Sequence, residues 1–161
     1  MNQTLTAQPL TRKAFQPFGD VLDCDGPPDA IINAGLCSRY HDRANLAFHE
    51  GRAGISLFNA TLRTLPYSFD LVERHPDGSQ AFIPLSEDPF LVIVAPDEAG
   101  KPGAPQAFLT GKGQAINFHR ATWHGVLTPL SGSGLFAVVD RIGDGPNLEE
   151  FTYKTAWTVT Q

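Results

Sequence analysis

Several features are scarce in this sequence, and each scarcity argues against a class of protein. Two cysteines, Cys24 and Cys37, are too few for a disulfide framework and do not form a Cys-x-x-Cys metal clip. The longest uninterrupted apolar run, Phe90–Ala95, is far shorter than the roughly 20 residues that cross a membrane. Residues 1–10 lack the basic start and the apolar segment of a signal peptide. We therefore expect a cytoplasmic protein that does not enter the membrane.

Positive charge is also scarce, with 12 lysines and arginines against 17 acidic residues and a formal net charge of −5. No run of basic residues occurs, so we expect no binding to duplex nucleic acid. Arginine supplies most of the positive charge, because few of the basic residues are lysines. A guanidinium donates two parallel hydrogen bonds to a carboxylate. This usage fits a small anionic substrate.

Glycine and proline are abundant, with 15 and 13 residues, and they separate short apolar runs. The pattern predicts an all-β fold of roughly eight or more short strands, in a sandwich or a small closed barrel that protects strand edges. The 161 residues are expected to form one domain spanning 1–161. We expect a short helix from Thr11 to about Gln16, a loop over 97–105, and the last clear strand over 135–139.

Four polar residues beside predicted strands are the first candidates for chemistry. Glu73 and His75 are two positions apart, so they share one face of an extended chain. Gln80 follows a Pro-Asp-Gly turn and is expected to face them from a neighbouring strand, with His124 joining from a distant one. Four nitrogen and oxygen donors suit a divalent metal ion. A structural role stays open here, because His before Pro often sits in a turn and Glu is commonly a solvated strand residue.

The spacing of these residues resembles the two motifs of the cupin superfamily. The first motif has the form G-x5-H-x-H-x(3,4)-E-x6-G, and Glu73-x-His75-x4-Gln80 matches its spacing with Glu and Gln at two ligand positions. The second has the form G-x5-P-x-G-x2-H-x3-N, and the stretch from Gly113 to His124 matches its spacing up to the histidine.

Longer blocks of the sequence resemble the signature of the ureidoglycolate lyases, formerly called ureidoglycolate hydrolases. They occur in the family's order and at compatible spacings, and the resemblance runs from about Phe15 to Arg141. The blocks are NAGL at 33–36, RYHD at 39–42, ERHPDGSQAFIP at 73–84, NFHRATWH at 117–124 and DR at 140–141.

This resemblance implies a cupin-like β-barrel, a homodimer, and cleavage of (S)-ureidoglycolate to glyoxylate and urea. That reaction belongs to the degradation of allantoin, a purine breakdown product. The resemblance also implies a divalent metal, nickel being the one usually named for the family. Cleavage needs a base for the hydroxyl proton, an acid for the departing urea nitrogen and a positive group for the carboxylate.

The candidate site residues follow from these needs. His75 and His124 are predicted to face the metal or to handle protons. Glu73 is a predicted ligand or base, and Gln80 a predicted ligand or hydrogen-bond partner of the substrate. The candidates for binding the substrate carboxylate are four arginines: Arg39, Arg74, Arg120 and Arg141.

Secondary candidates support or replace these residues. Arg74 is ranked low among the arginines, because it points away from its neighbours on a regular strand. Asp140 is expected to orient a histidine or to pair with Arg141, and Trp123 to pack in the barrel wall. Two further histidines, His41 and His119, are the next candidates for the site.

Two other function classes compete with this reading. One is a metal-dependent cupin enzyme acting on a different oxyanion, which is disfavoured because such sites usually keep two or three histidines. The other is a cupin that binds a small acid as a sensor, which is disfavoured because no DNA-binding helical segment is attached.

Overall fold

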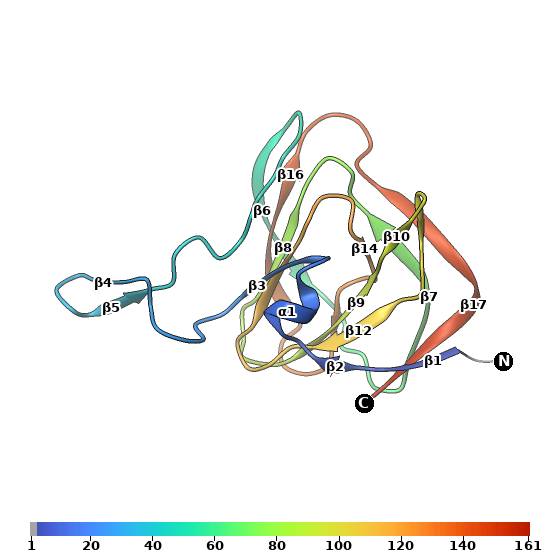
Figure 1. The fold of residues 1–161 in the computed structure, drawn as a ribbon, viewed down its shortest axis with the longest axis horizontal. Coiled ribbons are helices and arrows are strands. Elements are labelled where there is room, and N and C mark those ends of the chain that lie inside the picture. Colours follow the sequence, from blue (N-terminus) through green and yellow to red (C-terminus); the bar gives the residue numbers. More distant parts are fainter. Residues whose placement is uncertain (1–2) are drawn as a thin grey trace.

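The computed structural model describes residues 3–161 and consists almost entirely of β-strands (Figure 1). Residues 1 and 2, which belong to the segment in which no signal peptide is expected, lie outside this range. Two curved sheets face each other and form a nearly closed barrel. The larger sheet has the order β1-β17-β7-β14-β9-β12-β2, with β15 paired to β9. The smaller sheet has the order β3-β13-β8-β16-β6. The predicted all-β, cupin-like barrel is confirmed.

The bounds of the strands are as follows. The larger sheet contains β1 (Gln3–Thr6), β2 (Gln8–Pro9), β7 (Tyr67–Arg74), β9 (Phe90–Ala95), β12 (Gln106–Leu109), β14 (Trp123–His124), β15 (Thr128–Pro129) and β17 (Glu149–Thr160). The smaller sheet contains β3 (Gly19–Leu22), β6 (Arg52–Asn59), β8 (Gln80–Pro84), β13 (Ala115–Phe118) and β16 (Leu135–Ile142). Two small hairpins are β4 (Ala30–Ile32) with β5 (Cys37–Arg39), and β10 (Asp97–Glu98) with β11 (Lys101–Pro102).

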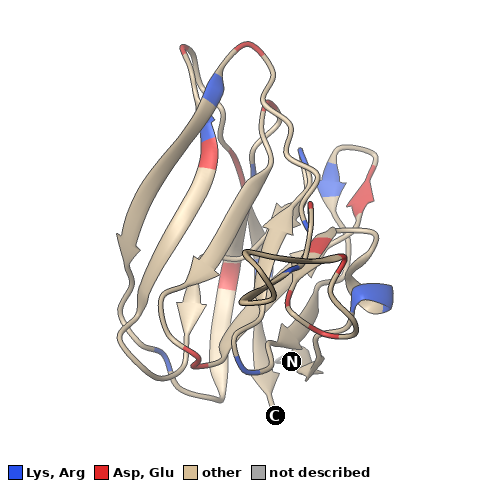
Figure 2. Ribbon diagram, turned by 90° about the vertical axis from the view of Figure 1, so that its left-hand side faces the viewer, with Lys and Arg blue, Asp and Glu red and all other residues tan. Residues whose placement is uncertain are grey.

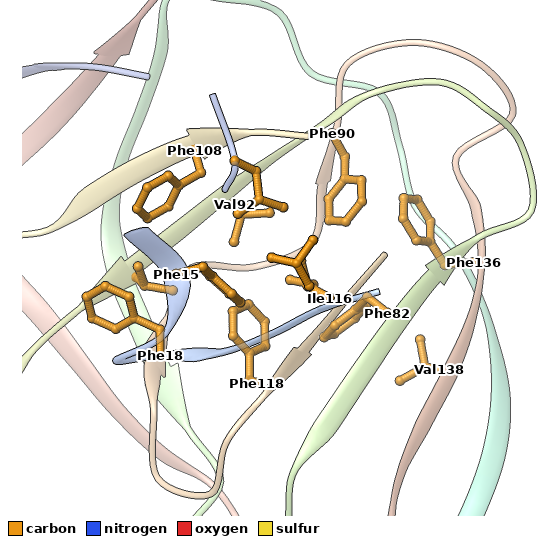
Figure 3. Close-up of a cluster of buried hydrophobic side chains, with 13 residues drawn as sticks. Phe15, Phe18, Phe82, Phe90, Val92, Phe108, Ile116, Phe118, Phe136 and Val138 are labelled. Carbon is orange, nitrogen blue, oxygen red and sulfur yellow. The ribbon is translucent and has the colours of Figure 1, made fainter. Parts of the chain in front are cut away.

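Strand β9 shows how the barrel is packed, because all six of its residues are buried. Phe90, Val92 and Val94 point into the space between the sheets, where they join residues of the smaller sheet (Figure 3). The residues between them join a second cluster on the opposite face, against aromatic side chains of β17. Alternating burial of this kind follows from the two-residue period of a strand. The apolar run is therefore a strand shared by two hydrophobic clusters.

The predicted helix near the start is present as α1 (Arg12–Phe15). The Thr11 hydroxyl oxygen accepts a hydrogen bond from the main-chain N–H of Ala14, as the N-cap of a helix does. Among residues 3–161 no helix is long and apolar enough to cross a membrane. In Figure 2 basic and acidic segments are interspersed along the ribbon.

Two predictions about strand positions are wrong. The last strand is β17, the longest in the molecule, and not the stretch at 135–139. Its register against β7 shifts between Thr152 and Trp157, and this irregularity interrupts the alternation of large apolar residues. The segment predicted as a loop at 97–105 contains the β10–β11 hairpin.

Candidate active site and metal-binding cluster

Glu73, His75 and His124 meet inside one end of the barrel. Glu73 is near the end of β7, and β14 pairs with β7 so that His124 lies opposite it. His124 also lies opposite Val94, which faces the interior cluster. One ligand atom from each of the three side chains lies within 4.8 Å of the other two. The structure thus brings together three of the four predicted donors.

Both histidines hold one ring nitrogen on a main-chain oxygen and leave the other free. His75 Nδ1 lies 2.7 Å from the carbonyl oxygen of Asn147, and His124 Nδ1 lies 2.9 Å from that of Gly125. A carbonyl oxygen only accepts, so Nδ1 is the protonated nitrogen in the neutral form of each ring, and in that form Nε2 carries the lone pair. Both Nε2 atoms are buried and have no hydrogen-bond partner within residues 3–161.

His124 is held in a neutral state by its surroundings. Its side chain is almost completely buried, and its ring stacks on Phe118 with centroids 4.3 Å apart. Burial lowers the pKa of His124 to about 3, and repulsion from His75 acts in the same direction, while the hydrogen bond to the Gly125 carbonyl opposes them. A neutral imidazole is the form that binds metals and accepts protons.

Burial also favours the neutral form of Glu73, which for a carboxyl group is the protonated form. Desolvation raises the pKa of Glu73 above its ordinary value. Attraction to His75 acts against this rise, and repulsion from Glu150 adds to it. The nearest Glu73 carboxylate oxygen lies 3.9 Å from His75 Nε2. A carboxyl group with a raised pKa is suited to taking up and releasing a proton.

Gln80 reaches the interior from the opposite sheet. It pairs with Phe118, whose ring covers His124, so Gln80 lies across the barrel from β7 and not on a neighbouring strand as predicted. Its Nε2 donates to Asp140 Oδ2 at 3.2 Å, and its buried Oε1 has no partner within residues 3–161. Within residues 3–161, the side-chain hydrogen bond of Asp140 is therefore with Gln80, in place of the predicted histidine or Arg141.

The hydrogen bonds of the Arg141 side chain go to main-chain oxygens of neighbouring loops and not to residues of the cluster. Its Nε donates to the His49 carbonyl at 2.5 Å, and its Nη2 donates to those of Glu50 and Asp144 at 2.9 and 3.1 Å. Three glycines make room for this side chain, since a Cβ built on each lies less than 3 Å from an Arg141 side-chain atom: Gly51, Gly78 and Gly143. Arg141 therefore clamps two loops beside the site.

The other predicted arginines also direct their guanidinium groups elsewhere. Arg74 pairs with Glu149 and Asp97 and lies over the Trp123 ring, on the face away from Glu73, as predicted. Arg120 donates to the Pro76 carbonyl at 2.9 Å. Arg39 contacts His41 on the β4–β5 hairpin, which projects from the barrel (Figure 1).

The remaining candidates also lie outside the cluster. Trp123 is buried against the second hydrophobic cluster, in agreement with the predicted packing in the barrel wall. His119 Nε2 lies 3.2 Å from Asp20 Oδ1. The pKa of Asp20 is lowered, because hydrogen bonds from Asn117, Asn45 and His119 outweigh its burial.

Sequence reasoning missed Asn147, which contacts the His75 segment twice. Its carbonyl oxygen accepts from His75 Nδ1, and its side-chain Oδ1 accepts from the main-chain N–H of Asp77 at 2.8 Å. Asn147 lies 72 residues from His75, in a loop between β16 and β17. The only signal in the sequence is a polar residue in a Gly- and Pro-containing loop, which is too common to single it out.

Comparisons with known proteins show the family to which the chain belongs. A family model described as ureidoglycolate lyase matches residues 2–160. The chain is 60% identical to the "Ureidoglycolate lyase" of Rhodobacter capsulatus over 150 residues, which cover 92% of this chain and 93% of the relative. It is 52% identical to that of Mesorhizobium japonicum and 48% identical to "Ureidoglycolate lyase 2" of Rhizobium meliloti, each over 157 residues and 96% of both chains. The resemblance seen in the sequence is thus confirmed, and the chain belongs to the ureidoglycolate lyase family.

Proposed function

We propose that this protein cleaves (S)-ureidoglycolate to glyoxylate and urea, in the degradation of allantoin. The observation that carries the proposal is the meeting of Glu73, His75 and His124 inside the barrel of a chain from this family. All three present a lone pair or a carboxylate to the same small space. This is the donor set that a proton transfer on a small anion requires.

The reaction moves one proton from oxygen to nitrogen. One carbon of ureidoglycolate carries a hydroxyl, a carboxylate and a ureido nitrogen. Loss of the hydroxyl proton forms the C=O bond of glyoxylate while the C–N bond breaks, and the nitrogen takes a proton to leave as urea. Because Glu73 is the carboxylate of the cluster, we assign to it the transfer of this proton between the two atoms. No covalent intermediate with the enzyme is required.

The residues of the cluster fit a divalent metal ion. The fit rests on three buried atoms without hydrogen-bond partners in the described chain: His75 Nε2, His124 Nε2 and Gln80 Oε1. These atoms and one oxygen of Glu73 would hold the ion, leaving the second Glu73 oxygen for the proton. Two imidazoles with oxygen ligands suit nickel, zinc or iron. A bound ion would supply Lewis acidity toward the hydroxyl and carboxylate oxygens of the substrate.

The charge of the site supports this metal. Glu73 contributes a carboxylate to the cluster, and Asp140 contributes a second one as the hydrogen-bond partner of Gln80. Within residues 3–161, none of the four predicted arginines forms an ion pair with Glu73 or Asp140, and only Arg74 is paired with carboxylates, those of Asp97 and Glu149. An anion entering beside carboxylates is disfavoured unless a cation is present. The proposed ion is that cation.

The family resemblance also leads us to propose a homodimer. Ile55 and Leu57 on the edge strand β6 are 77% and 68% exposed, on the outer face of the smaller sheet. On the β4–β5 hairpin, Ile31 and Leu36 are 66% and 89% exposed. Exposed apolar side chains grouped on a strand or a hairpin favour contact with another protein. A second copy packed on either element would cover residues that the single chain leaves in water.

We further propose that the enzyme acts in the cytoplasm. Cys24 and Cys37 are both exposed and free of disulfides, which suits a reducing compartment.

The proposal is tested by measuring products. Purified protein without an affinity tag should release urea and glyoxylate in equal amounts from (S)-ureidoglycolate. A chelator should stop the release, and added Ni²⁺ should restore it. Urea release that persists in chelator, from protein shown to contain no metal, would contradict the proposed need for a metal ion. No release under any metal condition would contradict the activity and favour a different oxyanion.

A further inference from the structure

We propose that Asn147 is a positioning residue for His75, an inference that rests on the proposed function of the cluster. Asn147 holds the turn that carries His75 at two points, one on each side of Pro76. These contacts fix both the orientation of the imidazole and the nitrogen that bears its proton.

One of the two contacts uses the main-chain oxygen of Asn147, and the other uses its side-chain oxygen. Its carbonyl oxygen accepts the His75 Nδ1 proton at 2.7 Å. Its Oδ1 accepts the main-chain N–H of Asp77 at 2.8 Å. Pro76, between them, has no N–H to offer. The side-chain bond therefore sets where the carbonyl oxygen lies relative to the His75 ring.

His75 needs this outside support, and His124 does not. The oxygen that accepts from His124 Nδ1 belongs to Gly125, the next residue in the chain, and the ring is stacked on Phe118. His75 follows the end of β7 and takes its acceptor from a distant loop. Partners of this kind fix the tautomer and the direction of the nitrogen that faces a metal or a substrate.

The loop that carries Asn147 is itself held in place. Arg141 donates to the Asp144 carbonyl on one side and to the His49 and Glu50 carbonyls on the other. The His49 main-chain N–H in turn donates to the Asp77 carbonyl at 2.7 Å. The segments around residues 49, 77 and 147 thus form one connected network. Asn147 is the member of this network that touches the His75 ring.

Three variants test the inference. Asn147→Ala removes the acceptor for the Asp77 N–H. Asn147→Asp keeps an acceptor oxygen at the same place, because only Oδ1 of Asn147 is used. Asp144→Ala, whose exposed side chain belongs to the same loop, is the control.

The first readout is the ¹⁵N spectrum of the histidine rings in metal-free protein. The wild type should show His75 with a protonated Nδ1 and a free Nε2. In Asn147→Ala the two His75 signals should move toward averaged values, while those of His124 stay unchanged. Asn147→Asp and Asp144→Ala should give the wild-type pattern. An unchanged His75 spectrum in Asn147→Ala would overturn the inference.

The second readout is the affinity of metal-free protein for Ni²⁺, measured by calorimetry alongside urea release. Asn147→Ala should bind Ni²⁺ about 10–100-fold more weakly, as is typical for loss of such a partner. Asn147→Asp should restore most of the affinity. Wild-type affinity in Asn147→Ala, even with a lowered thermal midpoint, would show a structural role only and would overturn positioning. If wild-type protein releases no urea, the proposed function fails, and the ¹⁵N spectra still decide the role of Asn147.

Discussion

Phe118 lies flat against His124, with the ring planes inclined by 6° and the centroids 4.3 Å apart. The centroid of His75 lies 5.3 Å from that of His124. One face of the His124 ring is therefore covered by an apolar side chain, while its Nε2 carries a lone pair near a second imidazole. A neutral histidine is stable in such a place, and a charged one is not.

The first prediction is a loss of stability at mildly acidic pH. Since the pKa of His124 is about 3 in the folded chain and 6.5 ordinarily, the unfolded chain binds a proton that the folded chain does not. The free energy of unfolding should fall as pH drops below about 6.5, by about 1.4 kcal/mol per pH unit from this group. Denaturant titrations at pH 7, 6 and 5 measure it.

His124→Leu is the matched variant for this measurement, because it fills the volume without a titratable group. Its dependence on pH should be weaker than that of the wild type. The raised pKa of Glu73 makes the folded chain more stable as the pH falls, which is opposite to the effect of His124. Both proteins contain Glu73, so comparing them removes most of this contribution. Equal dependence in both proteins would mean that His124 is protonated in the folded chain.

The second prediction concerns the contribution of His75 and His124 to the rate of urea release. His75→Leu and His124→Leu should each lower the rate of urea release by about 10²–10⁴-fold, the usual range for a positioned acid–base group. Emptying a metal site would lower it further. His49→Ala, an exposed histidine outside the cluster, is the control and should keep its rate. Near-normal release from either leucine variant in a folded protein would remove that histidine from the site.

The third prediction concerns the Gln80–Asp140 pair. Gln80→Glu with Asp140→Asn reverses their hydrogen bond and places a charged oxygen where Oε1 now lies. A carboxylate attracts a divalent cation more strongly than an amide does. Metal-free protein with both changes should therefore bind Ni²⁺ more tightly than the wild type in calorimetry. Unchanged affinity, with the fold intact, would show that Gln80 does not face the ion.

The fourth prediction concerns the Arg141 clamp. Arg141→Met removes charged donors from three main-chain oxygens, so the free energy of unfolding should fall by about 1–3 kcal/mol. Gly78→Ala should also destabilise, because its Cβ would lie 2.7 Å from that of Arg141. Denaturant titrations measure both. A raised KM in Arg141→Met without loss of stability would instead support the substrate anchor predicted from sequence.

The fifth prediction concerns oligomeric state. Light scattering at micromolar concentration should give about twice the chain mass of 17.5 kDa. Leu57→Asp should shift the protein toward the monomer, because it places a charge on the apolar face of β6. Lys112→Asp, on an exposed turn, is a control for adding negative charge. A dimer unaffected by Leu57→Asp would place the interface elsewhere.

Much of the site could be predicted because strands have a short and regular period. Spacing alone places Glu73 and His75 on one face and leaves Arg74 on the other, as the structure has them. The resemblance of two stretches to the two cupin motifs then predicts that His124 lies beside them. Sequence could not show that Gln80 belongs to the opposite sheet, because a turn sends the next strand to either sheet.

Other features could not be predicted for different reasons. Arg141 and Arg39 fit the role of an anchor by chemistry, and only contacts show that both guanidinium groups lie elsewhere. Asn147 acts partly through its carbonyl oxygen, which every residue possesses. Strand β17 did leave a signal in Phe151, Tyr153, Trp157 and Val159, but the register shift divides it into two short pieces.

The pairing of β1 with β17 bears on how the protein folds during synthesis. Gln3–Thr6 runs parallel to the end of β17, with Gln3 opposite Trp157 and Thr6 opposite Thr160. Among the described residues, β1 therefore has no sheet partner until β17 has been made. Contacts so far apart in sequence form slowly, because a long loop must close first. Strand β7, which carries Glu73, pairs with both β14 and β17, so its pairing too is complete only after β17 has been made.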